Sequence, residues 1–297
     1  MNNNLKKPPD WWIHDLEHWI ELSSFFSFVQ VNQITDKNCW KKLSTGQSNH
    51  NYRLDVLTKN TSKSYFVQLV NLDNQVLLPA VNPLAVIQQL DRYPKLQPWL
   101  VSCHLNTNSV RIFEWIDHSS ISPSSFHDQF FSSIVDFLTQ LHSENISTNT
   151  LSEYPMINIT EHLQRYRRLA LLKTPDSSRQ IEDTYQQAVS LTSNFVPNRL
   201  CHNDLSLSNF LWDKHQNQLK VVDWEYACYS DPVMDIAGLI INCHFNEHQE
   251  KHFLENCLSK DYLEQIDLKP PFEKLSDMKQ LSERLSRLWQ FAHHQKH

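Results

Sequence analysis

The stretch HNDLSLSNFLWDKHQNQLKVVDWE, which runs from residue 202 to residue 225, decides the interpretation of this chain. It holds four polar residues at fixed intervals, which are His202, Asp204, Asn209 and Asp223. A hydrophobic core does not require two carboxylates and an amide at such spacing. A phosphate bound through a metal ion does, because Mg²⁺ takes oxygen ligands. The segment after Asn209 predicts two strands joined by a polar turn, which would return Asp223 to the side of Asn209.

The rest of the chain predicts an α+β protein with two lobes. Alternating apolar residues and turn signals predict strands within 39–71 and 99–117. Apolar residues at helical spacing predict helices at 10–29, 82–94, 125–145, 158–172, 178–195 and 277–295. A strand-rich part followed by a helix-rich part indicates a small β-rich lobe at 1–116 and a larger helical lobe at 117–297.

Composition excludes several classes of function. The chain has 297 residues, of which 40% are hydrophobic and 20% charged, with a net charge of −6. This charge predicts no nucleic-acid partner but suits a cationic small molecule. The first residues lack the apolar region of a signal peptide, and no run approaches the roughly 20 apolar residues of a membrane span. The six cysteines are scattered singly. We therefore expect a cytoplasmic protein with no membrane partner.

Glycine is rare in this chain, which contains only Gly46 and Gly238. Average usage of roughly 7% would give about twenty. Turns must therefore rely on Asn, Asp, Ser and Pro. Each of the two glycines is a candidate for a position that only glycine can fill.

The segment HNDLSLSNFL followed by VVDWE resembles the aminoglycoside phosphotransferase and choline kinase family. These are small-molecule kinases with a protein-kinase-like fold, and their pattern is H-x-D-x-x-x-x-N followed by two apolar residues and Asp. The later segment DPVMDIAGL, with Asp231 and Asp235, resembles another element of the family. The form DWEYA is most similar to the choline kinase and thiamine kinase branches.

The resemblance implies roles for the residues that match. Asp204 would accept or orient the proton of the acceptor hydroxyl, and His202 would brace the loop. Asn209 and Asp223 would bind Mg²⁺, which neutralises the phosphates of ATP. Asp235 resembles a residue that holds the catalytic loop in place.

A second resemblance lies in the first lobe. LSTGQSNHNYRL is similar to the nucleotide loop of the family, with Gly46, Ser48 and Asn49 at matching places. Taken alone, the same letters also suit an ordinary hairpin turn. VRIFEWIDH resembles the strand that leads out of the first lobe, where backbone groups near Glu114 and Ile116 would bind adenine. A buried strand leading to a linker predicts the same sequence.

Gln68 departs from the family pattern. It stands in the strand YFVQLV where the family carries a Lys or Arg that touches the phosphates. The helix expected next offers Gln88 or Gln89 but no acid. A neutral amide cannot supply the charge of a lysine. Either another cation takes part, with Lys63 and Arg53 as candidates, or the activity is reduced or lost.

The acceptor is predicted from residues around and after the loop. Aromatic faces bind organic cations, and Glu225 directly follows Trp224, so both are candidate substrate contacts together with Trp289. The commoner role of a tryptophan is core packing. Choline, ethanolamine and thiamine are favoured over an aminoglycoside, and thiamine and choline stay open alternatives, with a slight tilt to thiamine.

The sequence therefore predicts an ATP- and Mg²⁺-dependent phosphotransferase acting on a small, cationic alcohol. The alternatives are a nucleotide-binding pseudoenzyme with a regulatory or binding role, which Gln68 favours, and an aminoglycoside-type phosphotransferase. A metal-dependent hydrolase would need a histidine cluster such as H-E-x-x-H, and this sequence contains none.

Overall fold

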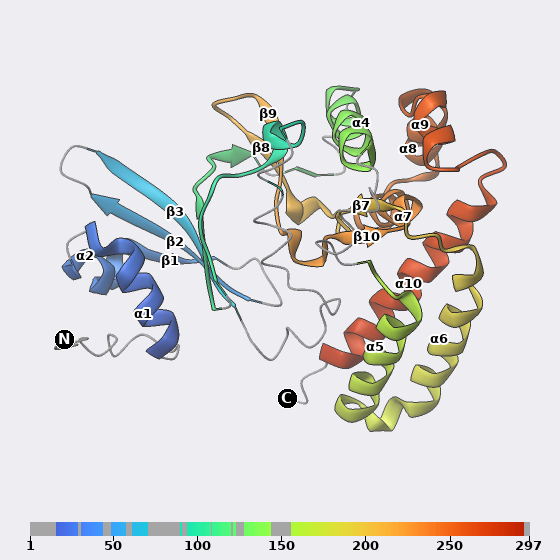
Figure 1. The fold of residues 1–297 in the computed structure, drawn as a ribbon, viewed down its shortest axis with the longest axis horizontal. Coiled ribbons are helices and arrows are strands. Elements are labelled where there is room, and N and C mark those ends of the chain that lie inside the picture. The colour runs from blue at the N-terminus through green and yellow to red at the C-terminus, as the bar shows by residue number, and fades with distance from the viewer. Residues whose placement is uncertain are drawn as a thin grey trace. The chain divides into compact units, whose positions relative to one another are not determined.

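The computed structural model describes residues 16–28, 31–43, 49–57, 61–70, 90, 94–107, 109–119, 121–122, 128–143 and 156–293. The chain divides into two compact units, Met1–Val76 with Leu100–Asp117, and Leu77–Trp99 with His118–His297. Strands dominate the first unit and helices the second (Figure 1), which confirms the predicted α+β class. The assignment of nucleotide binding to 1–116 and of catalysis to 117–297 stays a prediction.

The first unit contains a five-stranded antiparallel sheet in the order β1-β2-β3-β5-β4. Its strands are β1 (Trp40–Lys42), β2 (His50–Leu57), β3 (Ser62–Leu69), β4 (Cys103–Asn106) and β5 (Val110–Glu114). They fall within the two segments that predict strands. Alternation in β2 buries Leu54 and Val56 on one face and leaves Asp55 exposed, as expected of a sheet covered on one side.

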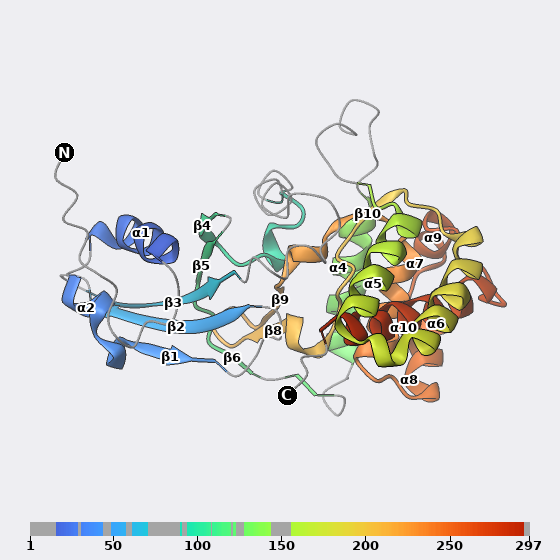
Figure 2. The same cartoon turned by 90° about the horizontal axis from the view of Figure 1, so that it is seen from below.

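Two helices accompany this sheet, α1 (Leu16–Phe25) and α2 (Val31–Thr35), with 3-10 turns at Phe26–Phe28 and Lys37–Cys39. Trp19 and Leu22 of α1 are buried in one cluster with Val67 and Ile112 of the sheet. Figure 2 shows α1 lying along the sheet. The predicted N-terminal helix thus contributes to the core of this unit, most of which comes from the sheet.

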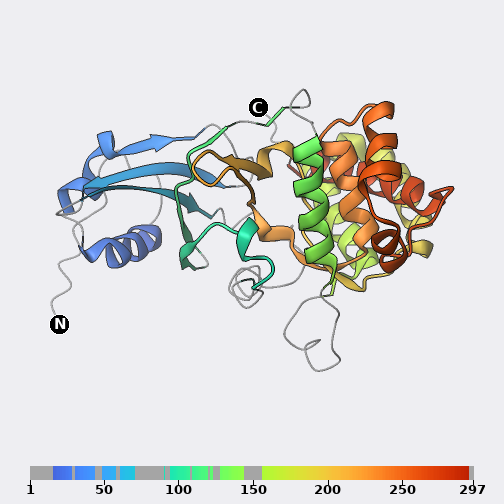
Figure 3. The ribbon, with the colours of Figure 1, turned by 90° about the horizontal axis from the view of Figure 1, so that it is seen from above.

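The second unit is mainly helical. Its helices are α4 (Asp128–Ser143), α5 (Ile159–Lys173), α6 (Ser178–Ser190), α7 (Pro232–Asn242), α8 (Glu247–His252), α9 (Lys260–Gln265) and α10 (Glu273–His293), with a π-helical turn at Phe253–Cys257 and 3-10 turns at Pro175–Ser177 and Thr192–Asn194. The helices α5, α6 and α10 lie side by side (Figures 1 and 2), and Figure 3 shows the same unit from above. Apolar residues of α10, including Met278, Leu281 and Leu288, are buried at helical spacing. Within the part of the chain that the structure describes, no helix has the length and apolar character needed to span a membrane.

Short strands lie within and around the segment 202–225. They are β6 (His118–Ser119), β7 (Arg199–Cys201), β8 (Phe210–Asp213), β9 (Gln218–Val221) and β10 (Cys228–Ser230), and 3-10 turns lie at Leu207–Asn209 and Trp224–Tyr226. β8 and β9 form the predicted hairpin, and β7 pairs with β10. The hairpin turn is closed by Asp213, whose Oδ1 accepts hydrogen bonds from the backbone N–H groups of His215 and Gln216.

A segment that precedes β4 belongs to the second unit. The 3-10 turn Gln97–Trp99 contacts β9, where Lys220 Nζ donates a 2.9 Å hydrogen bond to the carbonyl of Pro98. The ring of Trp99 also packs against Phe137 of α4. Most of the helix predicted at 82–94 lies outside the described residues.

Candidate active site

His202 follows β7 and braces the loop that it begins. Its ring is fully buried, and burial lowers its pKa, so the neutral form is favoured. Nε2 donates to the carbonyl of Val222 at 3.0 Å, and Nδ1 accepts from the backbone N–H of Asp204 at 3.3 Å. The ring therefore joins the start of the loop to the end of β9.

Asp204 and Asn209 are in direct contact. Asn209 Nδ2 donates to the carboxylate of Asp204 at 2.9 Å and to its backbone carbonyl at 2.8 Å. The 3-10 turn Leu207–Asn209 brings the two residues together. Because the amide nitrogen serves Asp204, the amide oxygen of Asn209, which lies 3.5 Å from Ser208 Oγ, is the atom of this side chain that can bind a cation.

The pKa of the Asp204 carboxyl is raised to about 7. Burial is the main cause, and the charges of Glu225 and Asp235 add to it, while the hydrogen bond from Asn209 acts in the opposite direction. A carboxyl that titrates near neutral pH can exchange a proton under physiological conditions.

Asp223 lies beside Asn209 through the β8–β9 hairpin. Phe210 pairs with Val221, and the N–H of Val222 donates to the carbonyl of Asn209 at 3.0 Å. The backbone of Asp223 is left-handed, with φ 65° and ψ 60°. Non-glycine residues adopt this conformation at a cost and often at functional sites. The carboxylate of Asp223 and the amide oxygen of Asn209 form the kind of oxygen donor set that suits Mg²⁺.

A group of acidic and aromatic residues surrounds Asp204. The side chain of Tyr226 lies close to those of Tyr166 on α5 and Trp289 on α10. Burial raises the pKa of both tyrosines, and the negative charges of Asp204 and Glu225 raise it further. Glu225 is itself buried. The arrangement combines negative charge with aromatic surface in the neighbourhood of the candidate base.

A comparison with family models decides which family this chain represents. Residues 40–257, more than half of the chain, match the phosphotransferase enzyme family known as APH. The chain belongs to this family. The predicted resemblance is confirmed, and the match spans both β3 and the loop that carries Asp204 and Asn209.

Several relatives of this phosphotransferase-family protein are known. A LicA homolog of Mycoplasma capricolum is 30% identical over 130 residues, which cover 43% of this chain and 50% of that protein. The chain thus aligns with about half the length of that relative.

The choline kinase LicA from Streptococcus pneumoniae has a similar structure, with a TM-score of 0.71, 21% identity and coverage of 92% of this chain and 89% of the other. The Plasmodium vivax ethanolamine kinase gives a TM-score of 0.65 at 16% identity, with 97% and 86% covered. These similarities confirm the kinase-like fold.

In this phosphotransferase-family protein, Trp224 packs in the core. Its ring contacts those of Phe137 and His202, and its Nε1 donates to the carbonyl of Val221 at 3.0 Å. Trp289 is instead half-buried and stacks on His293, with 3.8 Å between ring centroids. The side chain of Trp289 also lies close to that of Tyr226.

Gln68 has a cationic neighbour that the sequence did not single out. On the adjacent strand β5, Arg111 stands directly opposite Gln68, and its Nη1 donates to Gln68 Oε1 at 2.9 Å. Both side chains are buried. The two candidates named from sequence lie elsewhere, since Lys63 is exposed and Arg53 pairs with Asp55 at 2.8 Å.

The other residues predicted to bind nucleotide are described only in part. Gly46 and Ser48 lie outside the described residues, and Asn49 is half-buried next to β2. Glu114 ends β5 with an exposed side chain, and its N–H donates to the carbonyl of Ser102 at 2.9 Å. Ile116 is half-buried after that strand. Their roles in binding adenine and phosphate stay predictions.

Sequence reasoning missed Tyr166, Tyr226 and Arg111. Tyr226 belongs to the DWEYA segment, so its place next to Glu225 was a usable signal. Tyr166 and Arg111 come from elements distant in the sequence, where a single sequence carries no sign of the contact.

Proposed function

We propose that this protein is an ATP- and Mg²⁺-dependent phosphotransferase that moves the γ-phosphate to the hydroxyl of a small cationic alcohol. The contact between Asn209 Nδ2 and the Asp204 carboxylate, 2.9 Å long, carries the proposal. It joins a candidate base to a candidate metal ligand on one loop, which is the combination that phosphoryl transfer requires.

Asp204 acts on the acceptor hydroxyl. Its carboxylate accepts the proton as the oxygen bonds to phosphorus, and ADP leaves with the electron pair of the broken bond. A pKa of about 7 suits this role, because a base that titrates near the working pH is both available and strong enough. His202 positions the loop and takes no proton, since both ring nitrogens already have backbone partners.

Asn209 and Asp223 would hold the metal ion. When bound, Mg²⁺ supplies positive charge that offsets the negative charge of the phosphates. The left-handed backbone of Asp223 and the hydrogen bond between Val222 and Asn209 keep the two oxygen donors on adjacent segments.

On the nucleotide side, Arg111 is our candidate for the charge that Gln68 lacks. Its guanidinium lies on the same face of the sheet as Gln68, one strand away, and its planar donor groups suit phosphate oxygens. Gln68 orients the guanidinium through the 2.9 Å hydrogen bond. Gly46, Ser48 and Asn49 would approach the phosphates, and backbone groups near Glu114 and Ile116 the adenine.

The acceptor site is proposed to comprise Glu225 and Trp289 with Tyr166 and Tyr226. A carboxylate with aromatic neighbours recognises an organic cation through charge and ring faces. Choline and ethanolamine kinases are among the similar structures, which supports acceptors of this size. Thiamine remains a candidate. Trp224 would act indirectly, by fixing the backbone next to Glu225.

A nucleotide-binding pseudoenzyme is the second candidate, and Gln68 is the observation that favours it. The two are distinguished by measuring ADP release with ATP and Mg²⁺ over a panel of choline, ethanolamine, thiamine and kanamycin. The proposed function predicts release stimulated by a small cationic alcohol and not by kanamycin. ATP binding without release on any acceptor would favour the pseudoenzyme, and stimulation by kanamycin alone would indicate an aminoglycoside-type enzyme.

A further inference from the structure

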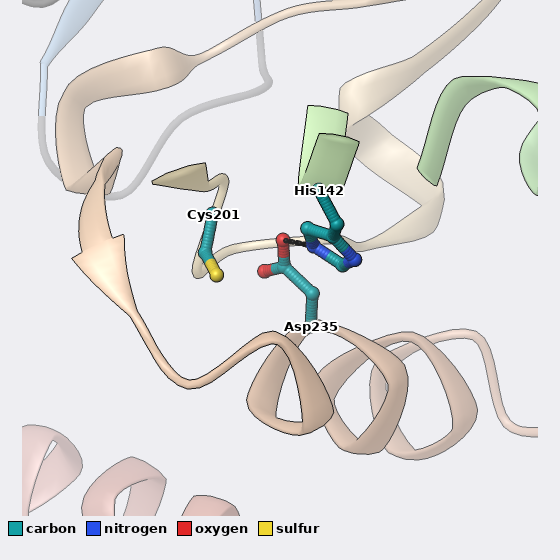
Figure 4. A group of neighbouring side chains, drawn as sticks. All are labelled: His142, Cys201 and Asp235. Atoms are coloured by element: carbon teal, nitrogen blue, oxygen red, sulfur yellow. Dashed lines mark hydrogen bonds and ion pairs between the residues drawn. The ribbon is translucent and has the colours of Figure 1, made fainter. Parts of the chain in front are cut away.

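Behind the candidate base lies a fully buried polar cluster formed by His142, Cys201 and Asp235 (Figure 4). Their ligand-type atoms lie within 4.8 Å of one another, which raises the question of a metal site. Burial raises the pKa of the Cys201 thiol well above its usual value, which favours the neutral thiol over the thiolate that binds metals.

The carboxylate of Asp235 is already engaged in hydrogen bonds. Its Oδ2 accepts from the backbone N–H of His202 at 2.8 Å and from His142 Nε2 at 3.1 Å. Its Oδ1 accepts from the N–H of Asn203 at 2.7 Å. Three of the roughly four acceptor sites of the carboxylate are thus used, so the cluster is better explained as an anchor for the loop that begins at His202.

His142 connects this anchor to α9. Because the carboxylate of Asp235 only accepts, His142 Nε2 carries the hydrogen. In the neutral imidazole, Nδ1 is then the acceptor, and the Tyr262 hydroxyl lies 2.6 Å from it. The rings of Tyr262 and His142 are nearly parallel, and Gln265 of the same helix donates to the backbone carbonyl of His142 at 2.8 Å.

We infer that Tyr262 is a positioning residue for the loop that carries Asp204. Its hydroxyl holds His142 in the tautomer that donates to Asp235, and Asp235 holds the backbone of His202 and Asn203, the two residues before Asp204. Asn203 has a left-handed backbone with φ 61°, so the loop has a conformation that needs such support. The effect on catalysis rests on the proposed function, whereas the effect on the loop does not.

Tyr262→Phe removes only the hydroxyl. His142 Nδ1 then becomes a buried hydrogen-bond acceptor without a donor. The His142 ring then keeps only its hydrogen bond to Asp235 and can change its orientation, which loosens the loop. His142→Gln offers an amide donor toward Asp235, whereas His142→Leu offers none. Gln should therefore preserve more of the anchor than Leu.

The test is hydrogen–deuterium exchange on the full chain, with Tyr185→Phe on α6 as the matched control. Tyr262→Phe should raise exchange at the amides of His202 and Asn203 at least tenfold above the change elsewhere, and His142→Gln should raise it less than His142→Leu. Unchanged exchange at these amides, or a rise of equal size throughout the chain, would overturn the inference.

Kinetics give the second measurement. With an active acceptor, Tyr262→Phe should lower kcat about tenfold and leave the KM values for ATP and acceptor within about twofold, while Tyr185→Phe changes neither. A change in KM alone would contradict a positioning role. If the wild-type protein phosphorylates no acceptor, the proposed function fails, and the exchange measurement still decides the inference.

Discussion

Asp204 shows how the surroundings of one residue can set its chemistry. Burial and the nearby charges of Glu225 and Asp235 raise its pKa, and the Asn209 hydrogen bond limits the rise to about 7. The same hydrogen bond leaves the amide oxygen of Asn209 for a cation. One contact thus supports both proposed roles, that of Asp204 as a base and that of Asn209 as a metal ligand.

The pH dependence of the reaction should report this carboxyl. The proposed base must be ionised, so kcat/KM should rise about tenfold per pH unit below pH 7 and level off above it. Initial rates at subsaturating acceptor between pH 5.5 and 8.5 would measure this. A profile that is flat through this range would mean that Asp204 is not the titrating base.

Asp204 should also cost the protein stability. Its folded pKa of about 7 exceeds the unfolded value of 3.8, so ionisation opposes folding. The cost is absent below pH 3.8, grows between pH 3.8 and about 7, and is constant above that. Asp204→Asn should therefore be more stable than wild type at pH 8, by about 1–3 kcal/mol. A shift of three pKa units represents roughly 4 kcal/mol. The expected gain is smaller because the side chain is partly exposed. The gain should shrink at pH 5, and chemical denaturation at both pH values measures it. Equal gains at both pH values would contradict this explanation.

Residues close in sequence were the predictable ones. The five-residue step from Asp204 to Asn209 and the β8–β9 hairpin follow from local spacing and turn chemistry. Tyr166, Arg111 and Tyr262 reach their partners from distant elements, and a periodic pattern predicts which residues are buried without predicting which of them meet.

At the scale of elements, neighbouring strands place a cation beside Gln68. Gln68 of β3 faces Asn51 of β2 on one side and Arg111 of β5 on the other. These polar side chains lie on the face of the sheet opposite to the one that packs Val67 and Leu69 in the core. Arg111 of β5 therefore lies next to the position of β3 where the family carries its cation, as our proposal for its role requires.

Two substitutions at position 68 test this arrangement. Gln68→Lys places an ammonium beside the buried Arg111, so Tm without nucleotide should fall by several degrees, and ATP should raise Tm by more than in wild type. Gln68→Glu pairs with Arg111 and should show a smaller ATP-induced rise. Thermal unfolding with and without ATP and Mg²⁺ measures both. If ATP raised Tm equally in all three proteins, the side chains at positions 68 and 111 would not face the phosphates.

Gly238 corrects an expectation drawn from the rarity of glycine. It lies within α7, and an added Cβ would meet only Asn242 Nδ2, at an ordinary 3.9 Å. Glycine is therefore not required there. Gly238→Ala should stabilise the protein by about 1 kcal/mol through helix propensity, which corresponds to a rise of about 2–4 °C in Tm. A fall in Tm would indicate closer packing around α7 than the structure shows.

At the scale of the whole molecule, each unit has its own core, and the family match from 40 to 257 spans both. The α+β class and most of the helices and strands followed from hydrophobic periodicity. The attachment of residues 94–99 to the second unit did not, because it depends on contacts of Lys220 and Trp99 that leave no periodic pattern.

The most direct test of the central claim is mass-spectrometric detection of the phosphorylated acceptor, because ADP release alone can also come from ATP hydrolysis. The wild-type protein and Asp204→Asn would each be incubated with ATP, Mg²⁺ and choline, ethanolamine or thiamine. The proposed function predicts a phosphorylated product of at least one acceptor with wild type, and a yield at least a hundredfold lower with Asp204→Asn. No phosphorylated product from any of the three, or equal yields from the two proteins, would contradict it.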